Sequence, residues 1–165
     1  RSLTCGALRK ENVGEDVSLS GWVQQARDMN HFAFVDVRDR YGITQVIFPK
    51  DEANEDAHKR YQAAKELGRE FVVKVTGKVV ERSNKNAKRD TGEIEVVADS
   101  LEVLNKSLTP PFKIEDETDA QEDTRMRYRY LDIRRNPIKD ALLLRNRVTK
   151  VVREYLGQQD FVEVD

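Results

Sequence analysis

Two aromatic rings on one predicted strand carry the clearest chemistry in this 165-residue sequence. In the stretch "FAFVDVRD", small aliphatic residues alternate with Phe32 and Phe34 at the period of two that is typical of a strand with one buried face. The alternation puts both rings on the other face, together with Asp36 and Arg38, which we expect to face solvent. Exposed rings of this kind can stack on unpaired bases.

Polar side chains on the neighbouring predicted strands extend this candidate binding face. Cations hold phosphates, whereas amide and carboxylate groups read the Watson–Crick edges of bases. The polar candidates are Arg27, Gln45, Lys74, Lys78, Arg82 and Glu95. Singly, each has a plain structural explanation, because a strand Phe is often covered by a loop and outer Lys or Arg residues favour solubility. Their convergence on one face favours binding of single-stranded nucleic acid.

Several other function classes lack support. The sequence contains no phosphate-binding glycine loop, zinc-protease motif or nucleophile elbow, and its two histidines and single cysteine have no metal-ligand spacing. We therefore predict no catalytic residues and no metal site. The net charge of −1 argues against a polycation that would bind nucleic acids of every kind through charge alone. No apolar run reaches eighteen residues, the length of a membrane-spanning helix. We expect a cytoplasmic protein without a membrane segment.

The elements that must position these side chains are five strands and one helix. Alternation predicts the strands, and a spacing of three or four predicts a helix that starts at Asp51 as N-cap and stops at Gly68. Gly21 and Gly77 lie inside strands, where a barrel strand bends or bulges. The strands are expected over 17–27, 32–39, 43–48, 71–82 and 93–104. Their order, with the helix between strands three and four, predicts a mainly β, five-stranded OB-fold barrel. An SH3-like barrel is the main alternative, but it usually lacks this helix.

The C-terminal third is expected to be a hinge followed by one helix. Residues 105–135 show little period, contain Pro110-Pro111, and change from "EDETDAQED", with six acids, to "TRMRYRYLDIRR", with five arginines. Beyond them, Asn136 and Pro137 are a good N-cap and first helical residue, and Gly157 is a good residue just beyond a helix end. The helix would have an apolar face that nothing else in the chain covers. The sequence starts without methionine and ends inside "FVEVD", so we expect a piece of a longer protein.

Three stretches resemble one enzyme family. "GWVQQARDMNHFAFVDVRDRYGITQVIF" is similar to the anticodon-binding OB domain of bacterial aspartyl-tRNA synthetases, and "TPPFKIEDETDAQEDTRMRYRYLDIRR" is similar to their hinge. "ALLLRNRVTKVVREYLGQQDFVEVD" resembles the first part of class II motif 1. The resemblance divides the chain into an anticodon-binding domain at 1–104, a hinge at 105–135 and the start of a catalytic domain at 136–165. The asparaginyl and lysyl relatives share the OB fold and motif 1 but not this form of hinge.

The resemblance also assigns roles to individual residues. Phe34 would stack on the central anticodon base, and Gln45 would read the anticodon. The remaining anticodon contacts would be Arg27, Arg82, Asn86 and Glu95. Phe32 matches no family contact. The sequence departs from the family where "QQAR" replaces a run of arginines and where Asn30 replaces a loop glycine, a position that Asn tolerates in a left-handed conformation.

The implied parent is a homodimer that joins aspartate to its tRNA with ATP and magnesium, its subunits meeting through motif 1. The motifs that bind ATP are not in this sequence, so we expect no cofactor in the chain itself and no catalysis by it. The predicted function is recognition of the tRNA anticodon loop. The alternatives are an OB module that binds protein or oligosaccharide, and the asparaginyl or lysyl relative.

Overall fold

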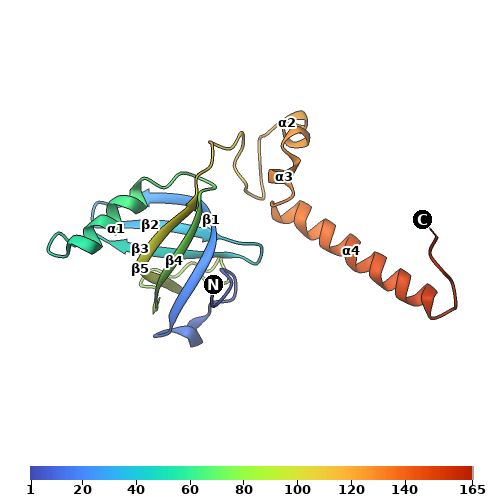
Figure 1. The fold of residues 1–165 in the computed structure, drawn as a ribbon, viewed down its shortest axis with the longest axis horizontal. Coiled ribbons are helices and arrows are strands. Elements are labelled where there is room, and N and C mark those ends of the chain that lie inside the picture. Colours follow the sequence, from blue (N-terminus) through green and yellow to red (C-terminus); the bar gives the residue numbers. More distant parts are fainter. Residues whose placement is uncertain (165) are drawn as a thin grey trace. The chain divides into compact units, whose positions relative to one another are not determined.

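The computed structural model of this protein describes residues 1–164. Its five strands pair in the order β1-β2-β3-β5-β4, and β4 pairs again with β1, so the sheet closes into a barrel (Figure 1). All pairs are antiparallel except β3 with β5, which are parallel over two residue pairs. The strands are β1 (Asp16–Asp28), β2 (Phe32–Arg38), β3 (Ile43–Pro49), β4 (Val72–Glu81) and β5 (Ile94–Asn105). The predicted β-β-β-α-β-β order is confirmed.

Alternating small and branched apolar side chains fill the barrel. On β4, for example, Val73, Val75 and Val79 are buried, whereas Lys74 and Lys78 on the opposite face are exposed. Burial of apolar surface on one face is what fixes strand register, because a shift by one residue would exchange the two faces. Residues before β1, which include the short 3₁₀ helix η1 (Lys10–Asn12), add the buried Cys5 and Leu8 to the same core.

Helix α1 (Glu55–Lys65) lies between β3 and β4 in the sequence. It packs on the barrel, where it contacts β1, β2, β3 and β5. Its buried residues are Tyr61 and Ala64, part of the predicted apolar stripe. The predicted N-cap was wrong: Asn54 caps the helix, and its side-chain oxygen accepts hydrogen bonds from the backbone N–H groups of residues 56 and 57. Asp51 instead accepts from the N–H of Ala53 in the loop. Both residue types suit a cap, so residue type alone did not distinguish them.

Gly21 and Gly77 have different structural reasons. At Gly77 the pairing of β4 with β5 changes register, which confirms a bulge, and a Cβ there would lie 2.1 Å from the carbonyl oxygen of Val97. The register of β1 with β2 changes between Val23 and Gln25, not at Gly21. A Cβ at Gly21 would lie 2.4 Å from the carbonyl oxygen of Arg38. Close backbone approach, rather than a bulge, requires glycine at position 21.

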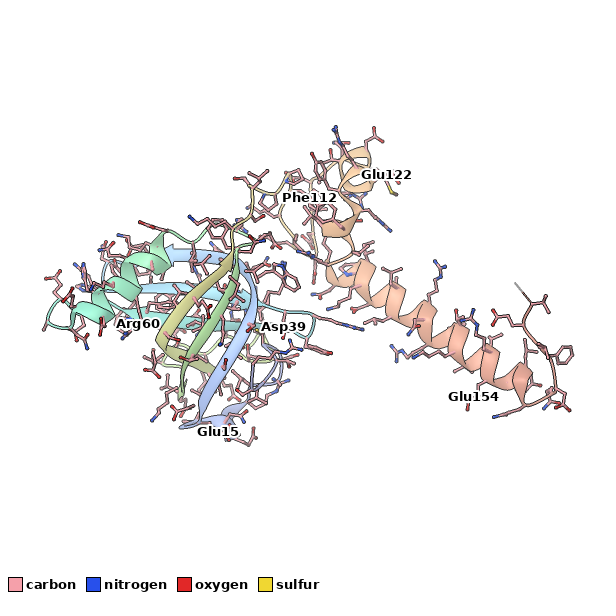
Figure 2. All side chains as sticks on the ribbon, in the orientation of Figure 1. Glu15, Asp39, Arg60, Phe112, Glu122 and Glu154 are labelled. Carbon is pink, nitrogen blue, oxygen red and sulfur yellow. The ribbon has the colours of Figure 1, made fainter. Side chains whose placement is uncertain are left out.

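A second compact unit begins at Pro111, and the first comprises Arg1–Pro110. The region expected to be an irregular hinge contains two short helices, α2 (Glu122–Arg127) and α3 (Arg129–Asp132). It also has a small core of its own, in which Phe112, Ile114 and Leu131 are buried. Phe112 is labelled in Figure 2. Three buried residues at irregular spacing leave no helical or strand period, which is why the sequence pattern missed this core.

Helix α4 (Asn136–Gly157) starts one residue earlier than predicted, because Arg135 occupies the N-cap position. Asp116, from the acidic stretch, accepts a hydrogen bond from the N–H of Asn136 at 3.3 Å. Gly157 is the last helical residue rather than the residue beyond the end, and the left-handed conformation falls at Asp160, with φ 64°. No described residue of α4 is buried, so its apolar face is uncovered, as predicted. Asp165 of the predicted 136–165 segment lies outside the described residues.

Candidate nucleic-acid interface

Strand pairing brings most of the predicted binding residues together on the outer face of the barrel. Phe34 lies opposite Arg27 of β1 on one side and opposite Ile47 of β3 on the other. Two residues along β2, Asp36 lies opposite Gln45 of β3. The alternation of β2 places Phe34 and Asp36 on the same face, because the aliphatic residues between them point into the barrel.

Gln45 is the centre of a hydrogen-bonded group that we call the Gln45 network. The Nη2 atoms of Arg82 and Arg27 donate to the side-chain oxygen of Gln45 at 2.9 and 3.5 Å. The Nε2 atom of Gln45 donates to Glu95 at 2.9 Å. These partners fix the orientation of the amide, since a flipped amide would face two guanidinium donors with its NH₂ group and a carboxylate with its oxygen. The network therefore consists of Arg27, Gln45, Arg82 and Glu95.

Glu95 is an acidic group in a mostly closed environment. Its side chain is buried, and its Oε2 atom lies 3.8 Å from Nε of Arg82. Burial raises the pKa of Glu95 above its usual value, while the hydrogen bond from Gln45 and the charge of Arg82 oppose that rise. A carboxylate held in this way can accept a hydrogen bond from an exocyclic amino group of a base.

Asp36 and Arg38 do not face solvent, contrary to the prediction. Asp36 is 1% exposed, and both of its oxygens accept hydrogen bonds from Arg89, at 2.8 and 2.9 Å. Arg38 is 8% exposed and donates to both oxygens of Glu70 at 2.8 and 2.9 Å, and also to Gln24. Alternation reports which way a side chain points, but not whether a segment distant in sequence covers it. Arg89 comes from the loop at 82–93 between β4 and β5.

The two rings differ in exposure. Phe32 is 44% exposed, whereas Phe34 is half-buried, and the ring centroids lie 6.1 Å apart with the planes tilted by 40°. Phe34 is thus held by a neighbouring ring and by its strand partners while one part remains open to solvent. A held ring with an open surface suits base stacking, since little side-chain freedom is lost on binding.

The other predicted residues lie apart from the Gln45 network. The side-chain oxygen of Asn86 accepts from the N–H of Lys88 at 3.0 Å, within the loop that also carries Arg89. Lys74 and Lys78 are exposed on β4 opposite residues 20 and 16 of β1, and Lys78 lies 3.9 Å from Asp16.

Sequence reasoning missed Asp36 and Arg89 as members of the site. An arginine in a polar loop carries no pattern that marks it as a partner for a strand residue 53 positions away.

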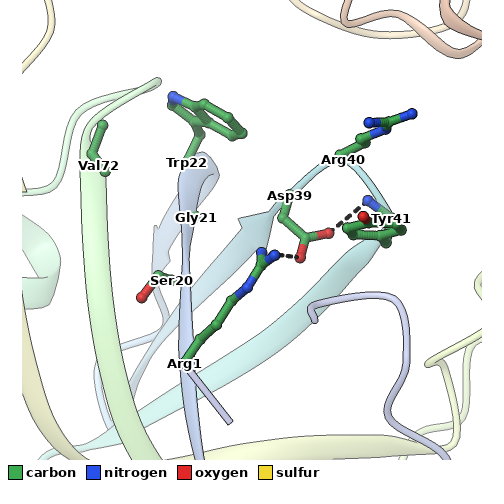
Figure 3. Close-up of a pocket in the computed structure, with 8 residues that line it drawn as sticks. All are labelled: Arg1, Ser20, Gly21, Trp22, Asp39, Arg40, Tyr41 and Val72. Carbon is green, nitrogen blue, oxygen red and sulfur yellow. Dashed lines mark hydrogen bonds and ion pairs between the residues drawn. The ribbon is translucent and has the colours of Figure 1, made fainter. Parts of the chain in front are cut away.

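A hollow elsewhere on the barrel contains none of the predicted contacts (Figure 3). It has a volume of about 310 Å³. The buried carboxylate that lines it belongs to Asp39, which already accepts hydrogen bonds from the backbone N–H groups of Cys5, Tyr41 and Gly42 and pairs with Arg1 at 3.5 Å. The lining residues are Arg1, Ser20, Gly21, Trp22, Asp39, Arg40, Tyr41 and Val72. The hydrogen-bonding groups that could read a ligand lie in the Gln45 network instead.

Among residues 1–164, no group of three or more His, Cys, Asp or Glu side chains is placed to hold a metal ion. No helix in the same range is long and apolar enough to cross a membrane.

Comparisons with known proteins place this geometry in a family context. Residues 17–104 match the model of the OB-fold nucleic acid binding domain, and residues 121–165 match that of class II tRNA synthetases (D, K and N). The aspartate–tRNA ligase of Flavobacterium psychrophilum is 53% identical over the whole of this chain. The chain spans 28% of that relative's length.

Solved structures share the fold. The asparaginyl-tRNA synthetase from Pyrococcus horikoshii, complexed with asparaginyl-adenylate, is 26% identical with a TM-score of 0.80, over 100% of this chain and 36% of that one. The aspartyl tRNA synthetase from Entamoeba histolytica has a TM-score of 0.89 at 19% identity, over 100% of this chain and 39% of that one. The second likeness concerns the fold alone.

Proposed function

The chain belongs to the family of OB-fold nucleic acid binding domains, and from that premise we propose that it recognises the anticodon loop for an aspartate–tRNA ligase. The observation that carries the proposal is the Gln45 network beside the half-open ring of Phe34. A ring to stack on a base, oriented hydrogen-bonding groups to read base edges and cations for phosphates are the three requirements of single-stranded RNA recognition.

Each residue has a distinct role in the proposal. Phe34 stacks on the central base of the anticodon. Gln45, Arg82 and Glu95 present an acceptor, donors and a second acceptor to base edges, and Arg27 contacts a phosphate or a base. Asn86 reaches the RNA from the loop between β4 and β5. These groups are already ordered by one another, so binding requires little further loss of side-chain freedom.

The rest of the chain has a supporting role. We propose that residues 1–104 form the anticodon-binding domain, 105–135 a connecting hinge and 136–165 the start of the catalytic domain. The parent protein would be a cytoplasmic homodimer that joins aspartate to tRNA with ATP and Mg²⁺, its subunits meeting through the segment that contains α4. Among residues 1–164, no group of three or more His, Cys, Asp or Glu side chains is placed to hold that magnesium ion.

Titration with RNA hairpins tests the proposal. We expect the chain to bind an aspartate anticodon stem-loop at least tenfold more tightly than a hairpin with the same stem and a scrambled loop; a factor of ten corresponds to about 1.4 kcal/mol. Fluorescence anisotropy at fixed salt measures both affinities. Equal affinity for the two hairpins would contradict the proposal and leave an OB module for protein or oligosaccharide as the better reading.

Two further hairpins separate the related specificities. Stem-loops with asparagine and lysine anticodons have the same stem and differ only in the loop, so any difference in affinity reports base reading. Tighter binding of either one than of the aspartate stem-loop would assign the chain to that relative instead.

A further inference from the structure

The carboxylate of Asp36 links two arginines from separate elements, Arg27 at the end of β1 and Arg89 in the loop between β4 and β5. Arg89 donates from Nη1 to one oxygen and from Nη2 to the other, and Nη2 of Arg27 lies 3.5 Å from the second oxygen. Asp36 itself is 1% exposed, whereas the side chains of Arg27 and Arg89 are 43% and 29% exposed. A buried acid therefore holds two guanidinium groups that still reach the surface.

We propose that Asp36 is a positioning residue for RNA, which holds Arg27 and Arg89 as a pair of donors beside the ring of Phe34. This inference rests on the proposed function, since it assigns a further contact residue, Arg89, to the same site. Arg89 is the RNA contact and Asp36 acts through it. The ligand groups are the phosphates and base edges that flank the base stacked on Phe34.

The charge of the three groups suits an anionic ligand. One carboxylate and two guanidinium groups leave a net charge of +1 at this point. A guanidinium carries five N–H donors, and Asp36 takes two of those on Arg89. The remaining edge of the fork keeps the planar, two-donor geometry that matches a phosphate or the O6 and N7 atoms of guanine.

Asp36 also fixes the loop that carries Arg89. The N–H of Arg89 donates to the carbonyl oxygen of Asn86, and the hydroxyl of Thr91 donates to the carbonyl oxygen of Ile43 on β3, at 2.5 Å. Besides Arg82, which bonds to Gln45, the loop at 82–93 is thus fastened to the barrel at Asp36 and Ile43. Because Asn86 belongs to this loop, Asp36 also determines where Asn86 meets the RNA.

Replacement of Asp36 by asparagine gives a test in which positioning and simple electrostatics predict opposite signs. Asp36→Asn removes one negative charge, so a purely electrostatic site would bind RNA more tightly and with a steeper salt dependence. Positioning predicts weaker binding of the aspartate stem-loop, by about tenfold, since one set of charge-assisted hydrogen bonds loses its geometry. Affinity for the scrambled-loop hairpin should change much less.

Asp99→Asn is the matched control. Asp99 is exposed on β5 and belongs to no part of the site, so the substitution makes the same change in net charge without touching Arg27 or Arg89. We expect its affinity for the stem-loop to equal that of the unchanged chain or to exceed it slightly. All affinities are measured by anisotropy at two salt concentrations and are normalised to the folded fraction from circular dichroism.

Arg89→Lys tests the same contact from its other partner, in case Asp36→Asn does not fold. Lysine keeps the charge but cannot form the two-donor pair with Asp36. We expect a similar loss of affinity in this variant, and little additional loss when both substitutions are combined, because the two residues act as a unit.

The outcomes separate the two proposals. If the unchanged chain prefers the aspartate stem-loop but Asp36→Asn and Arg89→Lys bind it equally well or more tightly, the inference about Asp36 is wrong and the proposed function stands. If the unchanged chain binds both hairpins equally, the proposed function and this inference both fail. Weaker, less selective binding by both variants supports the inference.

Discussion

At the scale of single residues, the site consists of groups that hold one another in place. The amide of Gln45 has its oxygen and its nitrogen engaged by opposite partners, and the ring of Phe34 lies beside a second ring. These side chains are already oriented before the ligand binds, which reduces the conformational entropy lost on binding. Individual substitutions should therefore change RNA affinity more than they change stability.

Phe34→Ala is the clearest substitution at this scale. Stacking contributes on the order of 1–3 kcal/mol per base by alanine substitution, so we expect stem-loop affinity to fall by tenfold or more. The melting temperature should fall by only a few degrees, because Phe34 is half-buried and outside the barrel core. Anisotropy titrations and a thermal melt monitored by circular dichroism measure the two effects.

Phe32→Ala is the control, since Phe32 is a more exposed ring on the same strand without a proposed base contact. Its effect on affinity should be clearly smaller.

The salt dependence of binding separates the rings from the cations. Neither ring substitution should alter it, because a neutral ring releases no counterions, whereas Arg27→Ala should reduce the slope of log K against log salt by about 0.7, the value for one phosphate contact on a single strand. Unfolding of Phe34→Ala with unchanged binding per folded molecule would assign the ring to the core.

At the scale of elements, α1 closes one side of the barrel and is tied to the end of β1. The hydroxyl of Tyr61 donates to Asp28 at 2.7 Å, and Lys65 lies 2.7 Å from the other carboxylate oxygen. Asn30, with φ 65°, makes the tight turn from β1 into β2, as the sequence predicted for a residue that tolerates this conformation. These contacts hold the start of β2, and thus Phe34, in a fixed place.

Asn54→Ala tests the observed cap of α1. Loss of its hydrogen bonds to the first turn should lower the free energy of unfolding by about 1 kcal/mol. Asp51→Ala is the matched control, because Asp51 was the predicted cap but bonds only within the loop. Its effect should be smaller in urea denaturation. A larger loss for Asp51→Ala would contradict the observed start of the helix.

The contact of α1 with β1 predicts a dependence of stability on pH. Hydrogen bonds from Lys65 and then Tyr61 lower the pKa of Asp28 from 3.8 to about 2. Since the folded pKa lies below the unfolded one, the contribution is complete above the unfolded value and is lost as pH falls toward 2. Tyr61→Phe should lose less stability than the unchanged chain over this interval in urea titrations. Parallel curves for the two proteins would show that the hydroxyl does not act on Asp28.

At the scale of the whole molecule, the two units differ in how their residues are covered. The first unit has a closed core that includes fully buried residues from every strand, whereas the second has a core of three residues and a long helix with none buried. Six large apolar side chains of α4 between Leu144 and Leu156 are 40–63% exposed. A surface of this kind is usually covered by a partner in the functional protein.

Hydrogen exchange should separate the two units. Amides of the barrel strands are expected to exchange by global unfolding, and those of α4 many times faster, because no tertiary burial protects that helix. Exchange followed by NMR or mass spectrometry on a dilute sample gives both rates. Protection of α4 that rises with protein concentration would report self-association through its apolar face. Barrel-like protection of α4 at high dilution would contradict the expectation.

What the sequence determined by itself was the pattern of faces. Alternation on β2 and β4, the three-to-four spacing of α1 and the apolar stripe of α4 follow from local geometry, and so the order of elements and the core positions could be predicted. The same faces brought Phe34, Gln45 and Glu95 into the candidate site. Each of these inferences needs only residues close together in the chain.

Only the tertiary structure decided which outward side chains are covered and by what. Asp36 and Arg38 point outward as predicted, yet they are buried because Arg89 and Glu70 reach them from segments 53 and 32 residues away. The small core around Phe112 likewise joins residues 112, 114 and 131, which are apart in the sequence. Contacts of this kind form only when distant segments of the chain come together, and no local period in the sequence shows which segments will meet.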